Sequence, residues 1–393
     1  MDAAPIVITA NGLMQRGSDS SYAFAQDANF WYLTGIDEPD VILVMDRDKE
    51  YLIVPPRDAS RTAFDGAIDD NSLTSISGIA EILETEDGWN QLANRIKKVQ
   101  RVATIAPAPA YIERYGLYAN PARAQLTELI RSHNANIALL DLSPHLIQMR
   151  VIKQPAELKA IQSAIDITIA AIKAASTASK RAKYSYEYEL EAEITRGFRA
   201  RGATGHSFEP IVAGGVRACT LHNVSNNGQL AKDELVIMDV GAEVDHYAAD
   251  ISRTISLTKP SKRQQAVHAA VVEVQKFAYG RLKPGIMMAD YEQEIMLFMG
   301  KKLRSLGLIT SIDHDSVRKY YPHATSHFLG LNVHDAGDYS QPLQAGMVVT
   351  VEPGIYIAEE GIGIRIEDDV LITPKGIKIL SRRLSNDLTI RAV

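Results

Sequence analysis

The chain of 393 residues is 46% hydrophobic and 23% charged with a formal net charge of −6, values typical of a globular protein of more than one domain. The acidic balance argues against a nucleic-acid partner, and no apolar run reaches the roughly 18–20 residues that span a bilayer. The N-terminus lacks the basic region that begins a signal peptide, and the single cysteine, Cys219, fits a reducing compartment. We therefore expect a cytoplasmic protein with no nucleic-acid or membrane partner.

Residues 1–148 alternate strand-like and helix-like segments, which predicts an α/β domain. Strand-like runs rich in Val and Ile occupy 5–10, 40–46, 50–56, 101–108 and 135–143, and helix-like patterns occupy 76–100 and 122–134. A crossover at 142–155 then leads to the next domain, with Pro155 at the start of a new helix.

Residues 149–393 predict a larger α+β domain. Apolar residues recur at helical spacing from Leu158 to Ile172, and three more amphipathic segments occupy 184–202, 262–280 and 289–307. The remaining residues of this domain are expected to form strands and turns. The expected fold class is therefore α+β: four long helices against a largely antiparallel sheet, preceded by the smaller α/β domain.

Two hairpin-like segments of this domain each carry two carboxylates where a buried strand would be apolar. In "ELVIMDVGAEVDHYAADISRTI" these are Asp239 and Asp250, and in "MVVTVEPGIYIAEEGIGIRIEDDVLI" they are Glu352 and Glu367. A histidine precedes each hairpin, because His222 lies 17 residues before Asp239 and His334 lies 18 residues before Glu352. We interpret this as two similar halves that face one another, although so short an echo can also arise by chance.

Four crowded carboxylates cannot all remain ionised without cations, because like charges raise one another's pKa. Two divalent cations would neutralise them, and oxygen-rich ligation favours Mn(II), with Co(II) or Zn(II) as alternatives. His327, in "HATSHFLG", is the candidate nitrogen ligand, and Arg365 shares a strand face with Glu367.

A simpler interpretation stands beside each of these features. Asp245 and Asp338 are expected to be turn residues, and Glu367 could be paired with Arg365 for structure alone. His323 and His327, four residues apart, could share a polar helix face. Cys219 lies close to His222, but a small buried apolar side chain is favoured over a thiol–imidazole pair.

The motifs "IMDVGAEVDHYAADISRT", "HATSHFLGLNVHD", "TVEPGIY" and "GIRIEDDVLIT" together resemble the pita-bread metallopeptidases, which include aminopeptidase P, prolidase and methionine aminopeptidase. The resemblance implies a pita-bread catalytic domain over 149–393 that binds two metal ions. The metal ligands that it implies are Asp239, Asp250, His327, Glu352 and Glu367.

The segment "RGSDSSYAFAQDANFWYLTGIDEPDVILVMD" resembles the N-terminal domain of aminopeptidase P. This favours aminopeptidase P over prolidase, and it argues against methionine aminopeptidase, which is essentially the catalytic domain alone. By the same resemblance, residues 1–148 would limit substrate size and contribute to a homodimer or homotetramer. Two positions depart from the family pattern, since Phe64 stands where relatives often have Trp and Phe208 where they have Tyr.

The activity implied by the resemblance is that of an Xaa-Pro aminopeptidase, which releases the first residue of peptides that have proline second, by means of a hydroxide that bridges two metal ions. Glu352 would transfer the proton, and His334 would stabilise the oxyanion. By resemblance, His222 and His323 line the proline pocket, Tyr356 and Arg365 support it, and Asp19 is a speculative contact for the free amine.

Three alternatives remain open from the sequence. Prolidase would cleave only dipeptides. Creatine amidinohydrolase shares the fold but lacks the metal ligands. A non-catalytic peptide-binding module of the same fold would also have lost the ligands.

Overall fold

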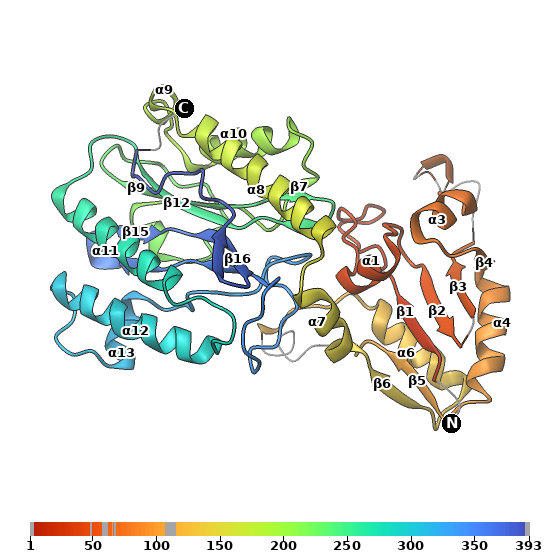
Figure 1. Cartoon of the computed structure of the whole chain (residues 1–393). Coiled ribbons are helices and arrows are strands. Elements are labelled where there is room, and N and C mark those ends of the chain that lie inside the picture. Colours follow the sequence, from red (N-terminus) through yellow and green to blue (C-terminus); the bar gives the residue numbers. More distant parts are fainter. Residues whose placement is uncertain are drawn as a thin grey trace. The chain divides into compact units, whose positions relative to one another are not determined.

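The computed structural model describes residues 4–47, 49–56, 62–64, 66, 68–106 and 115–389. The chain divides into two compact units, Met1–Leu146 and Ile147–Val393 (Figure 1). Helix α7 (Ser143–Val151) crosses the point of division. Among the described helices, none is both long and apolar enough to span a membrane.

The N-terminal unit contains a six-stranded mixed sheet in the order β4-β3-β2-β1-β5-β6. Its strands are β1 (Ile6–Thr9), β2 (Ile42–Asp46), β3 (Lys49–Val54), β4 (Glu81–Glu84), β5 (Arg101–Thr104) and β6 (Ala138–Asp141). Its helices include α1 (Ala28–Thr34), α3 (Asp70–Ser77), α4 (Thr85–Ile96) and α6 (Ala122–His133). β1–β2 and β2–β3 are antiparallel, and the other three pairings are parallel.

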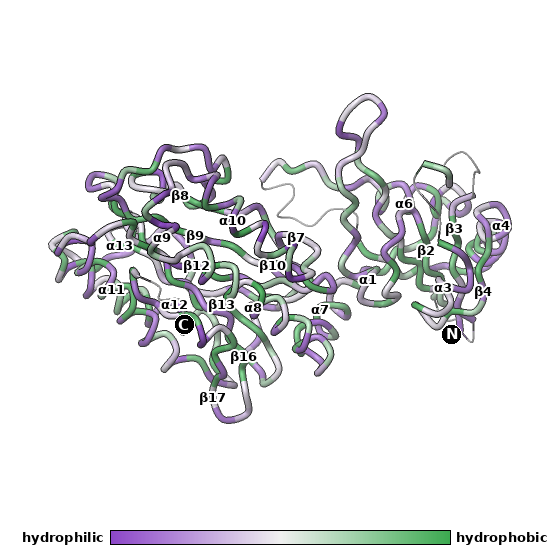
Figure 2. Tube along the Cα trace, turned by 90° about the horizontal axis from the view of Figure 1, so that it is seen from above, coloured by the Kyte–Doolittle hydropathy of each residue, from purple (hydrophilic) through white to green (hydrophobic). Residues whose placement is uncertain are grey.

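Alternating side chains of this sheet build two separate cores. Ile8 and Leu52 pack on the side that holds α1 and α3, whereas their neighbours Val7 and Ile53 pack on the side that holds α4 and α6. A strand buried on both faces requires this continuous apolar sequence. In Figure 2, the outer helices α4 and α6 carry hydrophilic stretches, while the strands between the two layers are largely hydrophobic.

The helix expected over 76–100 is wrong. Gly78 adopts a left-handed conformation, with φ of 77°, and ends α3 there. The chain then forms the edge strand β4, which pairs in parallel with β3, before α4 begins. The apolar residues of β4 also fit the spacing of an apolar helix face, which is why the sequence predicts a helix there.

The C-terminal unit has four long helices where the sequence predicts them: α8 (Pro155–Ala175), α10 (Glu187–Arg199), α11 (Lys262–Tyr279) and α12 (Met288–Ser305). The shorter elements are α9 (Ala178–Arg181), α13 (His314–Tyr320), η1 (Gly215–Cys219), β7 (Gly205–His206), β8 (Ile211–Gly214) and β17 (Gly376–Ile379). α8 packs on α10, α11 packs on α12, and every strand pairing described in this unit is antiparallel.

The first carboxylate hairpin is continuous in register. It consists of β9 (Leu235–Val240), β10 (Ala242–Val244), β11 (Tyr247–Ala248) and β12 (Ile251–Ser256). Asp245 and His246 close it with φ of 48° and 63°, as a tight two-residue turn requires. Gly241 lies where the arms pass closest, since a Cβ there would be 1.7 Å from the carbonyl oxygen of Ala249.

The second carboxylate hairpin is interrupted in the middle. β13 (Val348–Val351) pairs with β16 (Asp368–Thr373), and β14 (Gly354–Ile357) pairs with β15 (Ile362–Arg365). Its end is closed by η2 (Ala358–Glu360) and the left-handed Gly361. Glu352 and Glu367 stand opposite one another in the gap between the two strand pairs.

The two strand pairs part where Pro353, which has no N–H to donate, faces Ile366. The backbone at both glutamates bonds outside the hairpin. The Glu352 N–H donates to the Thr325 carbonyl at 2.8 Å, and the Glu367 N–H donates to the Ser252 carbonyl at 3.0 Å. The second of these bonds joins the second hairpin to β12 of the first. The two hairpins are thus held side by side at the level of their carboxylates.

Candidate metal centre

Three residues from different parts of the C-terminal unit form a cluster suited to a metal ion. Asp250, His327 and Glu367 each offer one ligand atom, and these atoms lie within 4.8 Å of one another. Asp250 comes directly before β12, Glu367 lies between β15 and β16, and His327 follows α13 in a segment without helix or strand. The cluster therefore exists only because the two hairpins and this segment meet.

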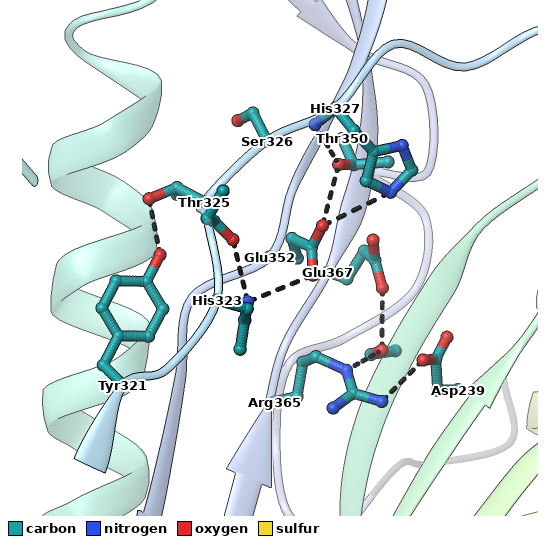
Figure 3. Close-up of polar contacts among 12 residues, drawn as sticks. Asp239, Tyr321, His323, Thr325, Ser326, His327, Thr350, Glu352, Arg365 and Glu367 are labelled. Atoms are coloured by element: carbon teal, nitrogen blue, oxygen red, sulfur yellow. Dashed lines mark hydrogen bonds and ion pairs between the residues drawn. The ribbon is translucent and has the colours of Figure 1, made fainter. Parts of the chain in front are cut away.

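Glu352 belongs to the same group. Nε2 of His327 lies 3.3 Å from Oε1 of Glu352 (Figure 3). The same nitrogen lies 3.4 Å from Oδ2 of Asp250. Nδ1 of His327 lies 3.0 Å from the carbonyl oxygen of Phe328, to which it can only donate. In this tautomer Nε2 presents its lone pair to the carboxylates, which is the state that a metal-ligating imidazole needs.

Asp239 reaches the group through Arg365. Nη2 of Arg365 donates to Oδ2 of Asp239 at 2.6 Å, while Oδ1 of the same carboxylate is buried with no hydrogen-bond partner among the described residues. Nε of Arg365 donates to Oγ of Ser252 at 2.9 Å, and that hydroxyl donates to Oε2 of Glu367 at 2.8 Å. The arginine therefore orients one carboxylate of each hairpin and leaves an oxygen of Asp239 for another partner.

The electrostatics of these carboxylates also favour a bound cation. Burial raises the pKa of Asp250, Glu352 and Glu367, and repulsion from neighbouring carboxylates raises it further. A buried, oxygen-rich group with one imidazole and an unpartnered carboxylate oxygen fits a divalent metal ion. Arg365 is the one Lys or Arg that forms an ion pair with a carboxylate of this group in the described part of the chain.

His323 is held beside the cluster in its neutral form. Nδ1 donates to the Ala324 carbonyl at 2.8 Å, and Nε2 lies 2.8 Å from the hydroxyl of Tyr356, which also accepts from Arg365. Burial and the nearby Arg365 lower the pKa of His323 to about 3. Nδ1 also lies 3.5 Å from Oε2 of Glu352, so both His323 and His327 face this glutamate. The alternative of a shared helix face is wrong, because α13 ends at Tyr320.

His334 and His222 are more exposed than the cluster itself. The ring of His334 packs edge-on against His327 at 4.4 Å between centroids. Its pKa is lowered to about 4 by burial of part of the ring, by His327 and by His222, so His222 is close enough to act on it electrostatically. The following residue, Asp335, is buried between Arg150 and Lys153, which ties down the loop that carries His334.

The remaining residues singled out in the sequence are not among those that form this cluster. Asp19 is exposed in the N-terminal unit, Phe64 is 86% exposed there, and Phe208 is half-buried in the C-terminal unit. The thiol of Cys219 lies 3.6 Å from the Ile362 carbonyl, and burial raises its pKa to about 11, which argues against a reactive thiolate. Asp338 caps its own turn by accepting from the Ser340 N–H at 2.9 Å.

Comparisons with known proteins agree with this geometry. Residues 159–374 match the model of metallopeptidase family M24, and residues 1–104 match the model of the aminopeptidase P N-terminal domain. The chain belongs to metallopeptidase family M24. Family membership and the Asp–His–Glu cluster together support a divalent metal ion at this site.

Similar proteins cover nearly the whole chain. The Xaa-Pro aminopeptidase of Haemophilus influenzae is 34% identical over 95% of this chain and 89% of its own length. Human Xaa-Pro aminopeptidase 3 is 35% identical over 96% of this chain and 78% of its own length.

Solved structures extend the similarity to the fold. Zn-substituted aminopeptidase P from Escherichia coli, in complex with product, has a TM-score of 0.84 at 29% identity and covers 99% of this chain and 93% of that one. Aminopeptidase PepP from Pseudomonas aeruginosa has a TM-score of 0.87 at 28% identity and covers 99% of this chain and 92% of that one. The chain thus has the aminopeptidase P fold, with a pita-bread domain at its C-terminal end.

Sequence reasoning missed three side chains that hold the cluster of this M24 domain. Ser252 lies on the same strand face as Asp250, two residues later, and links Arg365 to Glu367. Asp369, two residues after Glu367, is fully buried and accepts from the Asp250 N–H at 3.1 Å. The hydroxyl of Thr350 lies 3.4 Å from Oε1 of Glu352, two residues on. The two-residue period of a strand was the available signal in all three cases.

Proposed function

We propose that the chain is an Xaa-Pro aminopeptidase, which hydrolyses the bond between the first residue of a peptide and a proline in second position. The observation that carries the proposal is the convergence of carboxylates from two hairpins on His327, in a chain similar to named Xaa-Pro aminopeptidases through both of its units. The peptide substrate comes from that similarity, since structures of aminopeptidase P hold substrate or product.

We assign the metal site to Asp239, Asp250, His327, Glu352 and Glu367, which would hold two divalent cations. Oxygen donors dominate this set, which favours Mn(II) over Zn(II) or Co(II). Bound cations supply Lewis-acid polarisation of the scissile carbonyl and increase the acidity of water. The unpartnered oxygen of Asp239 and the mutual repulsion of the buried carboxylates support this assignment.

Glu352 is the residue proposed to move the proton. Its two oxygens lie near His327 and His323, at the gap where the second hairpin opens. The carboxylate would accept a proton from the attacking water and deliver it to the proline nitrogen, acting as general base and then as general acid. The proline nitrogen can leave only as a protonated amine, so the reaction needs a proton donor next to it.

The surrounding residues are proposed to bind and orient the peptide. His323, kept neutral and fixed by Tyr356, would line the proline pocket together with His222. His334, packed against His327, would donate to the developing oxyanion. Arg365 would hold the Asp239 carboxylate in its orientation.

A comparison of Xaa-Pro dipeptides with Xaa-Pro-Xaa tripeptides, with and without chelator, tests this function. Cleavage of the tripeptides that stops on metal removal and returns with Mn(II) is the expected result. Activity confined to dipeptides would identify a prolidase instead. Full activity in protein shown to be metal-free would refute the proposal.

The variant Glu352→Gln tests the proton transfer directly. We expect a loss of about 10²–10⁴-fold in kcat, because general acid–base catalysis contributes about that much, with metal content largely retained. Glu359→Gln, at the exposed turn of the same hairpin, is the matched control and should leave kcat unchanged. Near-normal turnover of Glu352→Gln would contradict the assignment.

We also propose a homodimer or homotetramer. Multi-angle light scattering of the purified chain tests this, and a monomer at all concentrations would contradict it.

A further inference from the structure

At the break in the second hairpin, Pro353 has no N–H to donate to the carbonyl of Ile366 opposite it, so a ladder bond is missing there. The carbonyls of Val351, Ile366 and Glu367 lie directly at this break, next to two of the assigned ligands. A buried carbonyl without a donor is unfavourable, so something must replace the missing ladder bonds. Side chains from outside the hairpin do so.

Arg253, in β12 of the first hairpin, is the larger of these side chains and is 1% exposed. Its Nη1 donates to the Ser252 carbonyl at 2.9 Å and to the Glu367 carbonyl at 2.5 Å, so it joins the two hairpins. Nε and Nη2 donate to the carbonyls of Ser385 and Leu384, at 3.0 and 3.1 Å. Nη2 also donates to Oδ1 of Asp368, the residue after Glu367, at 2.7 Å. Every donor of this guanidinium is engaged.

Gln275, from α11, contacts the carbonyls at the break through its side-chain amide. Its Nε2 lies 3.4 Å from the Val351 carbonyl and 3.3 Å from the Ile366 carbonyl, which belong to opposite arms of the hairpin. The same atom donates to Oδ2 of Asp368 at 3.0 Å, and that oxygen also accepts from the hydroxyl of Tyr279 at 2.6 Å. Gln275 is fully buried.

We propose that Arg253, Gln275 and Asp368 are positioning residues that hold the two carboxylate hairpins at the separation that a metal ion requires. None of them faces the cluster, because Asp368 points to the opposite side of its strand from Glu367. The three residues fix the positions of Glu352 and Glu367 indirectly, through the backbone next to these two glutamates. The inference rests on the proposed function only in taking these carboxylates as metal ligands.

The prediction is that metal affinity, more than folding, depends on this network. Gln275→Met keeps the volume of the side chain and removes its donors, and Arg253→Lys keeps the charge next to Asp368 but cannot reach both hairpins. Each variant is expected to weaken Mn(II) binding by about 10–100-fold, the usual effect of losing groups that support metal ligands. Tyr279→Phe, which removes one bond to Asp368, should weaken it less.

Arg181→Lys is the matched control. Arg181 is also a buried arginine that donates to a carbonyl of β12, that of Ser256, but at the end of the strand away from the carboxylates. We expect it to bind Mn(II) as the unmodified chain does, whatever its effect on thermal stability.

Metal dissociation constants would be measured by competition with a fluorescent chelator, alongside circular dichroism and thermal unfolding. The inference is overturned if Gln275→Met is folded and binds Mn(II) as tightly as the unmodified chain, or if Arg181→Lys weakens binding as much. If Arg253→Lys does not fold, Gln275→Met and Tyr279→Phe decide the question. Because no substrate is used, a chain that binds metal through this network but cleaves no Xaa-Pro bond would refute only the proposed activity.

Discussion

Glu292, on α12, is a buried carboxylate outside the metal cluster whose removal has a calculable effect. Its oxygens accept from the N–H and the hydroxyl of Thr325 at 2.8 and 3.0 Å, and that hydroxyl also bonds to Tyr321. The Thr325 carbonyl in turn accepts from the Glu352 N–H. Burial raises the pKa of Glu292 from its ordinary value of 4.5 to about 7.

The direction of the pH effect follows from this pKa. Between pH 4.5 and 7 the folded chain binds the Glu292 proton more tightly than the unfolded chain does, so the stability linked to this proton is fully present below pH 4.5 and is lost as the pH rises through 7. At about 1.36 kcal/mol per pKa unit, the loss approaches about 3 kcal/mol. Glu292→Gln does not titrate, and its amide can still bond to the Thr325 N–H.

Urea unfolding of the metal-free chain at pH 5 and pH 8 checks this expectation. The stability of Glu292→Gln relative to the unmodified chain should rise by about 2.5 kcal/mol between the two pH values, since other titrating groups are common to both proteins. Glu294→Gln, on the same helix with its side chain 44% exposed, should show no such change. Parallel pH profiles for Glu292→Gln and the unmodified chain would refute the reasoning.

Three further changes have effects that follow from the structure. Gly241→Ala would place a Cβ 1.7 Å from the carbonyl oxygen of Ala249. Thermal unfolding should therefore show a loss of about 1–3 kcal/mol or more in stability, and metal binding should weaken. Gly205→Ala, with open space around it, should change stability by less than about 0.5 kcal/mol. Asp335→Asn would remove the carboxylate that pairs with two buried cations and should cost about 3–5 kcal/mol in denaturant unfolding. Glu367→Gln relieves the crowding of buried carboxylates, so the metal-free variant should melt higher than the metal-free chain but gain less on addition of Mn(II).

Local sequence patterns were sufficient to identify the carboxylates and most of the elements that carry them. Asp239 interrupts an apolar run, and a buried strand tolerates such a residue only where it has a partner. The pattern failed at 76–100 because the apolar residues of an edge strand lie within helical spacing of their neighbours. In this segment, only the left-handed conformation of Gly78 distinguishes one long helix from a helix followed by a strand, and that conformation is a property of the folded backbone.

The hydrogen bonds that hold the carboxylate cluster in place could not be predicted from local sequence patterns. The register of each hairpin is set by its own sequence, but the opening at Glu352 and Glu367 depends on Thr325 and Ser252, which arrive from elsewhere in the chain. Hydrogen bonds to such distant backbone groups leave no periodic signal in the sequence.

The two hairpins therefore present their carboxylates in a similar way. In the first, the strand pairing stops between β9–β12 and β10–β11, and the Asp250 N–H donates to Asp369 of the second hairpin. In the second, the pairing stops at the glutamates, whose N–H groups donate to the first hairpin and to the segment that carries His327. The opening has to be stabilised by donors from other elements, because buried carbonyls are otherwise unsatisfied. The identity of the carboxylates is thus a local property of each hairpin, while their separation is a property of the whole C-terminal unit.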